Sequence, residues 1–153
     1  MTIVGFTAAR RLTQEDELTI ERVIVRLPSL PETVVTGACI GGDQFIAEWF
    51  LQNFSNVKQK VIVPDNLSQV DRSFLTVISR HPNVEMVYMP PGSSYRERNA
   101  RIVAECTRLI GFPPYIESHE FSARSGTWQT IRIGRRMGRE VNVHVLSESR
   151  SGQ

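Results

Sequence analysis

The stretch TVVTGACIGGD, residues 33–43, carries the clearest fold signal in the chain, because a continuous apolar run passes through glycines into a segment of helical period. Such an apolar run is typical of a strand that is covered on both faces, as in parallel sheets. The helix that follows has an expected buried stripe of Phe45, Ile46, Trp49 and Phe50. The stretch therefore predicts one strand-to-helix unit of a parallel α/β sheet.

The same alternation recurs along the chain. Six β-rich runs predict strands at residues 2–6, 33–38, 60–63, 84–89, 108–112 and 141–146. The helical segments between them cover residues 14–27, a region starting near Gly42, residues 67–80, a region opened by Ser94, and residues 125–137. Right-handed crossovers place such helices on both faces of a sheet. We therefore expect a three-layer, Rossmann-like α/β fold with a mostly parallel sheet of about six strands.

Composition indicates one ordinary globular domain. The chain has 153 residues, of which 41% are hydrophobic and 22% charged, and this excludes disordered and fibrous classes. We expect a single domain over residues 1–146 and a short flexible tail over residues 147–153. Since no apolar run approaches the ~20 residues of a membrane helix and the N-terminus lacks signal-peptide order, we expect a cytoplasmic protein without a membrane partner.

Cysteine and histidine usage gives no sign of a metal centre. Cys39 and Cys106 are expected to be small buried thiols rather than a disulfide. The three histidines show no metal-ligand spacing with each other or with the cysteines. We therefore predict neither a metal nor a cofactor.

Charge alone identifies no partner, because the net charge is only +2. The arginines are nevertheless clustered, at positions 96, 98 and 101 and at positions 132, 135, 136 and 139. Such runs are usually solvated helix faces, and an electrostatic binding surface is the alternative. A nucleic-acid partner is thus possible but not favoured.

Ligands of open parallel sheets lie beyond the carboxyl ends of the strands, where the strand order reverses. If the order is 3-2-1-4-5-6, the loops after the first and fourth strands, residues 7–10 and 90–94, form that crevice, with Thr7 and Arg10 as candidates. The glycines of the next loop, Gly37, Gly41 and Gly42, would let backbone N–H groups approach a phosphate. A tight strand-to-helix turn explains them equally well, and Asp43 would then only stabilise the first helical turn.

A long connection after the fifth strand, residues 113–124, has the length of a binding loop, a lid or a disordered segment. Its candidates for stacking on a base or pairing with phosphate are Tyr115, His119, Phe121 and Arg124. At the start of the last helix, Ser125, Gly126 and Thr127 offer hydroxyl and N–H groups for an anion, and ordinary capping by Ser125 is the alternative.

The helix opened by Ser94 carries the least usual pair of side chains. Asn99 falls on the apolar side of this helix and therefore needs a hydrogen-bond partner, either a loop or a ligand. Arg98 lies near the helix start, where its guanidinium would meet an anion at the crevice. A solvated arginine is the competing interpretation.

Taken together, the motifs TGACIGGD at 36–43, RERNARIVAEC at 96–106 and SGTWQTIRIGRRMGREVNV at 125–143 resemble the SLOG superfamily of Rossmann-type nucleotide-binding proteins. That superfamily includes the LONELY GUY (lysine-decarboxylase-like) phosphoribohydrolases and the DNA-processing protein A group. Within the superfamily, the chain resembles the small stand-alone YspA-like, DUF2493-type members. The resemblance implies a nucleotide-type ligand, bound by Arg98, Gly126 and Thr127, and a homodimer.

The sequence departs from the hydrolases at one position. Their PGGxGTxxE signature ends in a catalytic glutamate, and Thr130 stands at that place here. Since threonine supplies no carboxylate, any acid would have to come from elsewhere. The catalytic residues are thus unknown, and the candidates are Arg98, Asp43, Glu97, Glu117 and Glu120.

Three functions follow from these patterns. The first is a sensor or sequestering protein that binds a nucleotide or an ADP-ribose-like ligand at the carboxyl edge of the sheet. The second is an N-glycosidic hydrolase that acts on a nucleoside monophosphate. The third is a module for single-stranded DNA, which would need a basic groove with stacking aromatic side chains.

Overall fold

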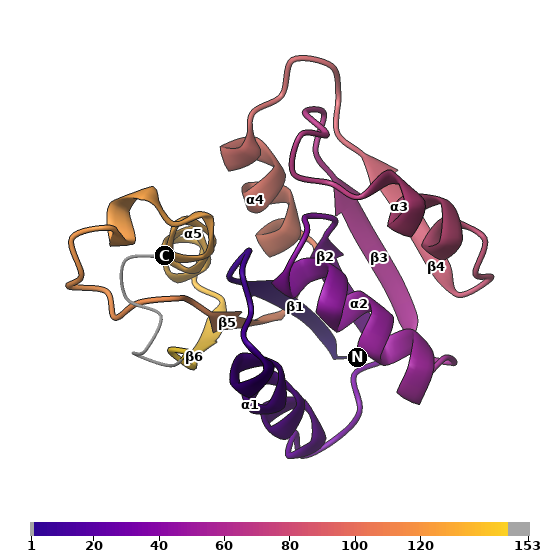
Figure 1. The fold of residues 1–153 in the computed structure, drawn as a ribbon, viewed down its shortest axis with the longest axis horizontal. Helices are drawn as coiled ribbons and strands as arrows, with labels where there is room; N and C mark the ends of the chain where they lie inside the picture. Colours follow the sequence, from indigo (N-terminus) through magenta and orange to yellow (C-terminus); the bar gives the residue numbers. More distant parts are fainter. Residues whose placement is uncertain (1, 147–153) are drawn as a thin grey trace.

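The structure of the protein is a computed structural model in which residues 2–146 are described, so the expected C-terminal tail, 147–153, lies outside the described residues. Within them, strands and helices alternate as the sequence predicts (Figure 1). The elements are β1 (Ile3–Ala8), α1 (Gln14–Val25), β2 (Thr33–Gly37), α2 (Gly42–Asn53), β3 (Lys58–Val63), α3 (Arg72–Ser79), β4 (Val84–Tyr88), α4 (Tyr95–Ala104), β5 (Arg108–Phe112), the 3₁₀ turn η1 (Ser122–Arg124), α5 (Gly126–Arg136) and β6 (Glu140–Val143).

The six strands of the described region form one sheet in the order β4-β3-β2-β1-β5-β6, which runs from right to left in Figure 1. All five strand pairings are parallel. The expected order 3-2-1-4-5-6 is wrong, because β4 lies outside β3 rather than beside β1. The chain moves in one direction from β1 to β4 and then returns through α4 to β5. The order therefore reverses between β1 and β5.

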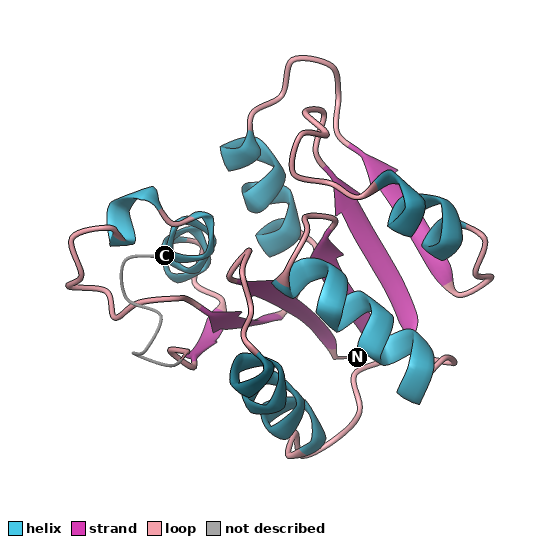
Figure 2. Ribbon diagram, viewed as in Figure 1, coloured by secondary structure: helices cyan, strands magenta, loops and turns pink. Residues whose placement is uncertain are grey.

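Helices cover both faces of the sheet, so the three-layer Rossmann-like fold is confirmed (Figure 2). On one face, α1 and α2 bury Ile20 and Phe50 against β1, β2 and β5, and α3 extends this layer over β3 and β4. On the other face, α4 and α5 pack Val103 and Ile133 against β2, β3 and β5. Both layers lie on a sheet whose central strands are almost completely buried, as their continuous apolar sequences predict.

Several predicted boundaries are wrong by two or more residues. Strand β1 ends at Ala8 instead of residue 6, α1 ends at Val25 instead of residue 27, and β3 begins at Lys58 instead of residue 60. Helix α3 begins at Arg72 instead of residue 67, because the Asp71 carboxylate caps it by accepting hydrogen bonds from the N–H groups of Ser73 and Phe74. Strand β6 ends at Val143, before the predicted residue 146. Cys39 and Cys106 are buried free thiols, as expected. Across residues 2–146, every helix falls short of the length and apolar character that a bilayer crossing requires.

Candidate functional site

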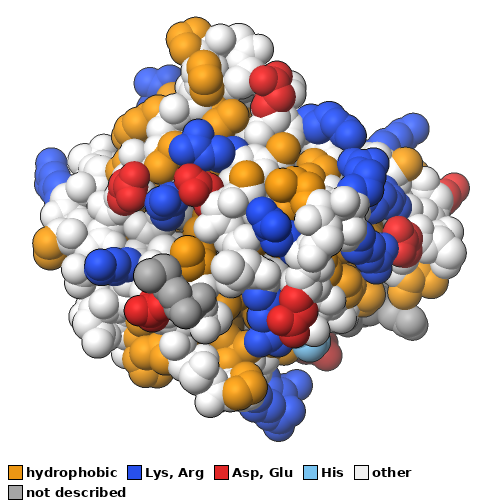
Figure 3. Space-filling view, turned by 180° about the vertical axis from the view of Figure 1, so that it is seen from behind, with side chains coloured by type: hydrophobic (Ala, Val, Ile, Leu, Met, Phe, Trp, Pro, Cys, Tyr) orange, Lys and Arg blue, Asp and Glu red, His pale blue; other side chains and the backbone are white. Residues whose placement is uncertain are grey.

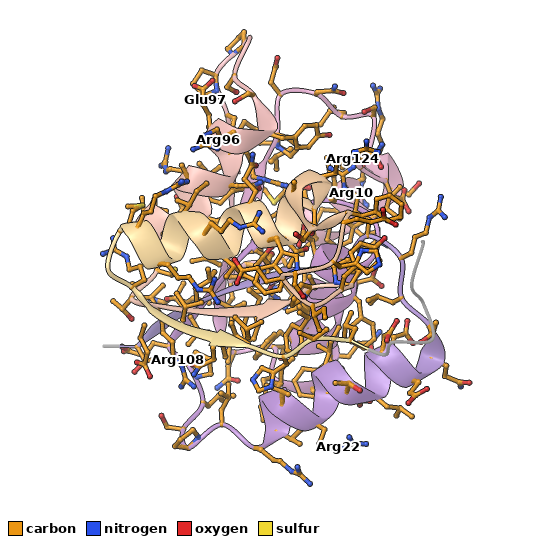
Figure 4. All side chains as sticks on the ribbon, turned by 90° about the vertical axis from the view of Figure 1, so that its left-hand side faces the viewer. Arg10, Arg22, Arg96, Glu97, Arg108 and Arg124 are labelled. Atoms are coloured by element: carbon orange, nitrogen blue, oxygen red, sulfur yellow. The ribbon has the colours of Figure 1, made fainter. Side chains whose placement is uncertain are left out.

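A cavity of about 540 Å³ lies at the carboxyl ends of β1 and β5, where the strand order reverses. Residues 7–11 and the turn after β2 form one side of it, and the starts of α4 and α5 with the loop after β5 form the rest. Figure 4 shows the side chains of Arg10 and Arg124 on the same side of the molecule, and both line this cavity. Open parallel sheets bind their ligands at this position.

A buried ion pair forms the charged part of the cavity wall. The Arg98 side chain, on the first turns of α4, comes within 4.0 Å of Asp43 Oδ2, and the two residues are only 5% and 7% exposed. Asp43 Oδ2 also accepts a hydrogen bond from the N–H of Cys39 at 3.3 Å. Burial raises the pKa of the Asp43 carboxyl, and the nearby Arg98 guanidinium opposes this shift only in part.

The remaining partners of the Arg98 guanidinium are all uncharged. Its Nε donates to Asn99 Oδ1 at 3.0 Å, and Nη1 and Nη2 make long contacts with Ile62 O at 3.5 Å and Cys39 Sγ at 3.6 Å. A buried guanidinium gains most from short bidentate contacts with an anion. The cavity thus contains an arginine whose charge is only loosely compensated.

Glycine makes this arrangement possible at the end of β2. A Cβ atom at Gly37 would collide with the guanidinium of Arg98 and with the carboxylate of Asp43. A larger residue at this position would therefore force Arg98 and Asp43 to move away from their present arrangement. This is a structural role for Gly37, which itself does not line the cavity.

The Tyr95 ring lines the cavity close to two arginines, the buried Arg98 and the exposed Arg10. The guanidinium carbon of Arg10 is 5.4 Å from the ring centroid and that of Arg98 is 5.6 Å away, both within the range of cation–π attraction. The Tyr95 hydroxyl donates to the carbonyl of Asn66 at 2.8 Å, which fixes the ring. Tyr95 therefore holds two cationic side chains at one wall of the cavity.

The loop after β5 forms the aromatic wall. Tyr115 is buried, its ring stacks on His119 at a centroid distance of 4.4 Å, and its carbonyl accepts a hydrogen bond from Trp128 Nε1 at 2.8 Å. The Arg124 guanidinium lies over the ring of Phe121. Residues 113–124 therefore form a packed loop that contains the 3₁₀ turn η1 and contributes one wall of the cavity. The disordered-segment alternative is thus wrong.

The start of α5, which packs beside α4, completes the lining of the cavity. The Ser125 hydroxyl accepts a hydrogen bond from the N–H of Trp128 at 3.2 Å, so the capping role is present. Ser125, Gly126 and Thr127 also line the cavity, so the N-terminal end of this helix and its partial positive charge face the same space. The two interpretations of Ser125 are compatible, because a hydroxyl that accepts one hydrogen bond can still donate another.

Most of the predicted binding residues come together at the cavity. The members that line it are Thr7, Arg10, Asp43, Arg98, Asn99, Ser125, Gly126 and Thr127. The polar group of Asn99 finds its partner within the chain, since Nδ2 donates to Gln129 Oε1 at 2.9 Å. Arg98 is buried, and this excludes the interpretation as a solvated arginine.

The glycines at the start of α2 lie elsewhere. Gly41 and Gly42 do not line the cavity, and the Gly42 N–H donates to the Ala9 carbonyl at 2.8 Å. A Cβ atom at either glycine would collide with residues 8–10. The glycines therefore allow the turns after β1 and β2 to pack together, which is the tight-turn alternative.

Three of the candidate carboxylates do not line the cavity. Glu97 is exposed and forms a capping box with Ser94, and Figure 4 shows it toward the left of the view, whereas Arg10 and Arg124 lie toward the right. Glu117 binds Arg132 and Arg135 at 3.3 and 2.9 Å, and Glu120 is exposed. Asp43 is thus the one carboxylate among the described residues that line the cavity.

The clustered arginines of α5 are partly neutralised within the chain. In Figure 3, Lys and Arg side chains gather toward the right-hand side of the face shown. Arg132 and Arg135 belong to α5, and both bind the carboxylate of Glu117. Ion pairing of this kind reduces the attraction of such a surface for a polyanion.

Sequence reasoning missed several residues of the cavity wall. Tyr95 was not among the predicted binding residues, and Cys39 was expected only as a small buried thiol. Cys39 Sγ lies against Arg98, and burial raises the pKa of its thiol. Arg11 and Pro114 also line the cavity. Only their nearness to the predicted loops could have indicated them.

No cluster of three or more His, Cys, Asp or Glu side chains within residues 2–146 is placed to hold a metal ion. Comparison with known proteins finds no family model, curated protein or solved structure that matches the chain.

Proposed function

We propose that the protein binds a nucleotide or a nucleotide-derived, ADP-ribose-like ligand in the cavity between β1 and β5, as a sensor or sequestering protein. The observation that carries this proposal is Arg98, a buried arginine on the cavity wall whose nearest carboxylate is 4.0 Å away. A phosphate group would give it the short charge-assisted hydrogen bonds that it lacks. The N-terminal end of α5 and Arg10 would add to the same attraction.

The size and lining of the cavity favour a nucleotide over a small inorganic anion. Its volume of about 540 Å³ falls in the range of small-molecule sites. Arg98 and Arg10 are the side chains that would bind a phosphate, whereas Tyr115 and Phe121 line another part of the cavity. Aromatic rings of this kind stack on bases. The resemblance to SLOG proteins points to the same ligand class.

Binding without catalysis is the simpler interpretation of this cavity. Thr130, at the position of the hydrolase glutamate, is buried, and its hydroxyl donates to the Gly126 carbonyl at 2.9 Å. It does not line the cavity. The chemistry of the hydrolases would therefore need a different acid.

Asp43 keeps hydrolysis as the second candidate function. Burial raises its pKa, which favours the protonated form that a general acid needs. In that case Asp43 would donate a proton as the N-glycosidic bond of a nucleoside monophosphate breaks. Water would add to the sugar, and the free base would leave.

One experiment separates the two functions. The purified protein is incubated with nucleoside monophosphates and ADP-ribose, and mass spectrometry quantifies retained ligands and released bases together. Retention without base release is the expected result. Release of a base that is lost in Asp43→Asn would establish the hydrolase instead, and neither retention nor release would contradict both functions.

Binding of single-stranded DNA and formation of a homodimer stay predictions, and each is tested by its own measurement. Affinity for an oligonucleotide would fall steeply with salt, whereas binding of a single nucleotide depends on salt less strongly. Fluorescence anisotropy with a labelled oligonucleotide at low and high salt tests the first prediction. Sedimentation velocity over a range of protein concentrations tests the homodimer.

Phe121→Ala is expected to weaken the binding of ADP-ribose by about tenfold, since loss of a stacking ring costs about 1–3 kcal/mol. Ribose 5-phosphate, which lacks a base, should lose much less affinity. Isothermal titration of both ligands measures this difference. Phe54→Ala is the matched control, because Phe54 is a partly exposed ring outside the cavity. Equal losses for the two ligands would contradict base stacking on Phe121.

A further inference from the structure

The ion pair of Asp43 and Arg98 has a property that nucleotide binding alone does not require. The hydrogen bond from the Cys39 N–H holds the Asp43 carboxylate at the cavity wall. Any anion that binds Arg98 would therefore use the same guanidinium that already pairs with Asp43. An anion that approaches Arg98 therefore also approaches a buried carboxylate. Two negative charges in one buried site repel each other strongly.

The groups that face Asp43 offset this repulsion only in part. They are Arg98 from α4, Arg10 from the turn after β1 and Cys39 from the turn after β2. Arg10 is exposed and Cys39 is a neutral thiol, so one buried positive charge would have to balance two negative charges. The lower-energy solution is to neutralise the carboxylate with a proton, after which its O–H can donate a hydrogen bond to the anion.

We propose that an anionic ligand enters this cavity together with one proton, which Asp43 takes up, so that affinity rises as pH falls. This inference rests on the proposed function, because it concerns the same site. It makes Asp43 a specificity-determining residue, because the protonated acid accepts an anion beside it and the ionised acid repels one.

Protonation of Asp43 is already favoured in the ligand-free protein. Burial raises the pKa of Asp43 above its ordinary value of 3.8, so the folded protein holds this proton more tightly than the unfolded chain. The contribution of Asp43 to the free energy of unfolding is therefore largest below the ordinary pKa, and it falls as pH rises toward the raised one. A bound anion raises this pKa further.

The choice of probe decides the test. A phosphate monoester titrates near pH ~6 and would itself contribute a pH dependence. The two linked phosphates of ADP-ribose have no group that titrates near neutral pH, so the charge of this ligand stays constant. The measurements cover about pH 5 to 8, the range in which a histidine could also take up a proton. Isothermal titration of ADP-ribose in pairs of buffers with different ionisation enthalpies then gives the number of protons taken up on binding.

We expect wild-type protein to take up close to one proton at some pH within this range, with affinity changing by up to about tenfold per pH unit. Asp43→Asn should bind ADP-ribose without proton uptake, and at the alkaline end more tightly than wild type, because the amide resembles the protonated acid. Circular dichroism and thermal unfolding check that this variant folds. If it does not fold, the pH profile of the wild type still decides.

Two control variants exclude other sources of the proton. His119 is the histidine nearest the aromatic wall, since it stacks on Tyr115, and His119→Gln should leave proton uptake unchanged. Glu97→Gln makes the same chemical change as Asp43→Asn at an exposed carboxylate outside the cavity, and it should also leave uptake unchanged.

The outcomes separate this inference from the proposed function. Binding of ADP-ribose with no proton uptake anywhere in the range, or uptake that disappears in His119→Gln, overturns the inference and leaves the nucleotide site standing. No binding of any ligand in the panel at any pH overturns both.

Discussion

Replacing Arg98 with alanine is expected to lower the affinity for ADP-ribose and for nucleoside monophosphates by about a hundredfold or more. The substitution removes the buried cation from the cavity wall, and truncating one partner of a buried charge pair costs about 2–5 kcal/mol. The remaining positive groups are exposed or belong to the helix terminus, so they replace it only in part. Isothermal titration at a single salt concentration measures the loss.

Two further variants separate the binding effect from loss of structure. Arg96→Ala removes the same charge two residues away on an exposed position of α4, and we expect less than about a twofold change in affinity because exposed charges contribute little. Arg98→Ala also leaves Asp43 buried without its cation, which destabilises the protein at any pH where Asp43 is ionised. Arg98→Ala with Asp43→Asn should recover most of that stability without recovering binding. Binding that returns in the double variant would contradict the role of Arg98.

The sequence predicts the alternation of strands and helices because each buried strand is a continuous apolar run between clear helix boundaries. It does not predict the strand order, which depends on which edge each crossover returns to. β4 illustrates the difference. Its residues identify a strand, but its pairing with β3 is set by how α3 and α4 pack on opposite faces of the sheet.

The site could be predicted to the extent that it follows from the ends of strands and the starts of helices. Arg98 and Thr127 were found because helix starts at the carboxyl edge of a parallel sheet point to one place. The role of Gly37 was not found, because its contact with Arg98 joins residues from separate elements. The contact of Gly42 also joins separate elements, because its N–H donates a hydrogen bond to the Ala9 carbonyl in the turn after β1.

Gly41→Ala is expected to destabilise the protein by about 3 kcal/mol or more. Gly41 has φ +99° and ψ −126°, a conformation that residues with a side chain rarely adopt, and such backbone strain costs about 1–3 kcal/mol. A new Cβ would in addition overlap the carbonyl group of Arg10. Because backbone cannot rotate away as a flexible side chain can, the turns after β1 and β2 would have to separate. Urea unfolding followed by circular dichroism measures the change.

Two other glycines resolve this cost into its parts. Gly92 has φ +82° with no atom within 4 Å of its would-be Cβ, so Gly92→Ala tests strain alone and should cost about 1–2 kcal/mol. Gly126 has neither a positive φ nor a neighbour at that distance, and alanine there should change stability by less than about 1 kcal/mol, in the stabilising direction. The expected order of destabilisation is therefore Gly41, Gly92, Gly126. If Gly41→Ala costs no more than Gly92→Ala, the contact with Arg10 contributes nothing, and the packing of the two turns does not depend on glycine at this position.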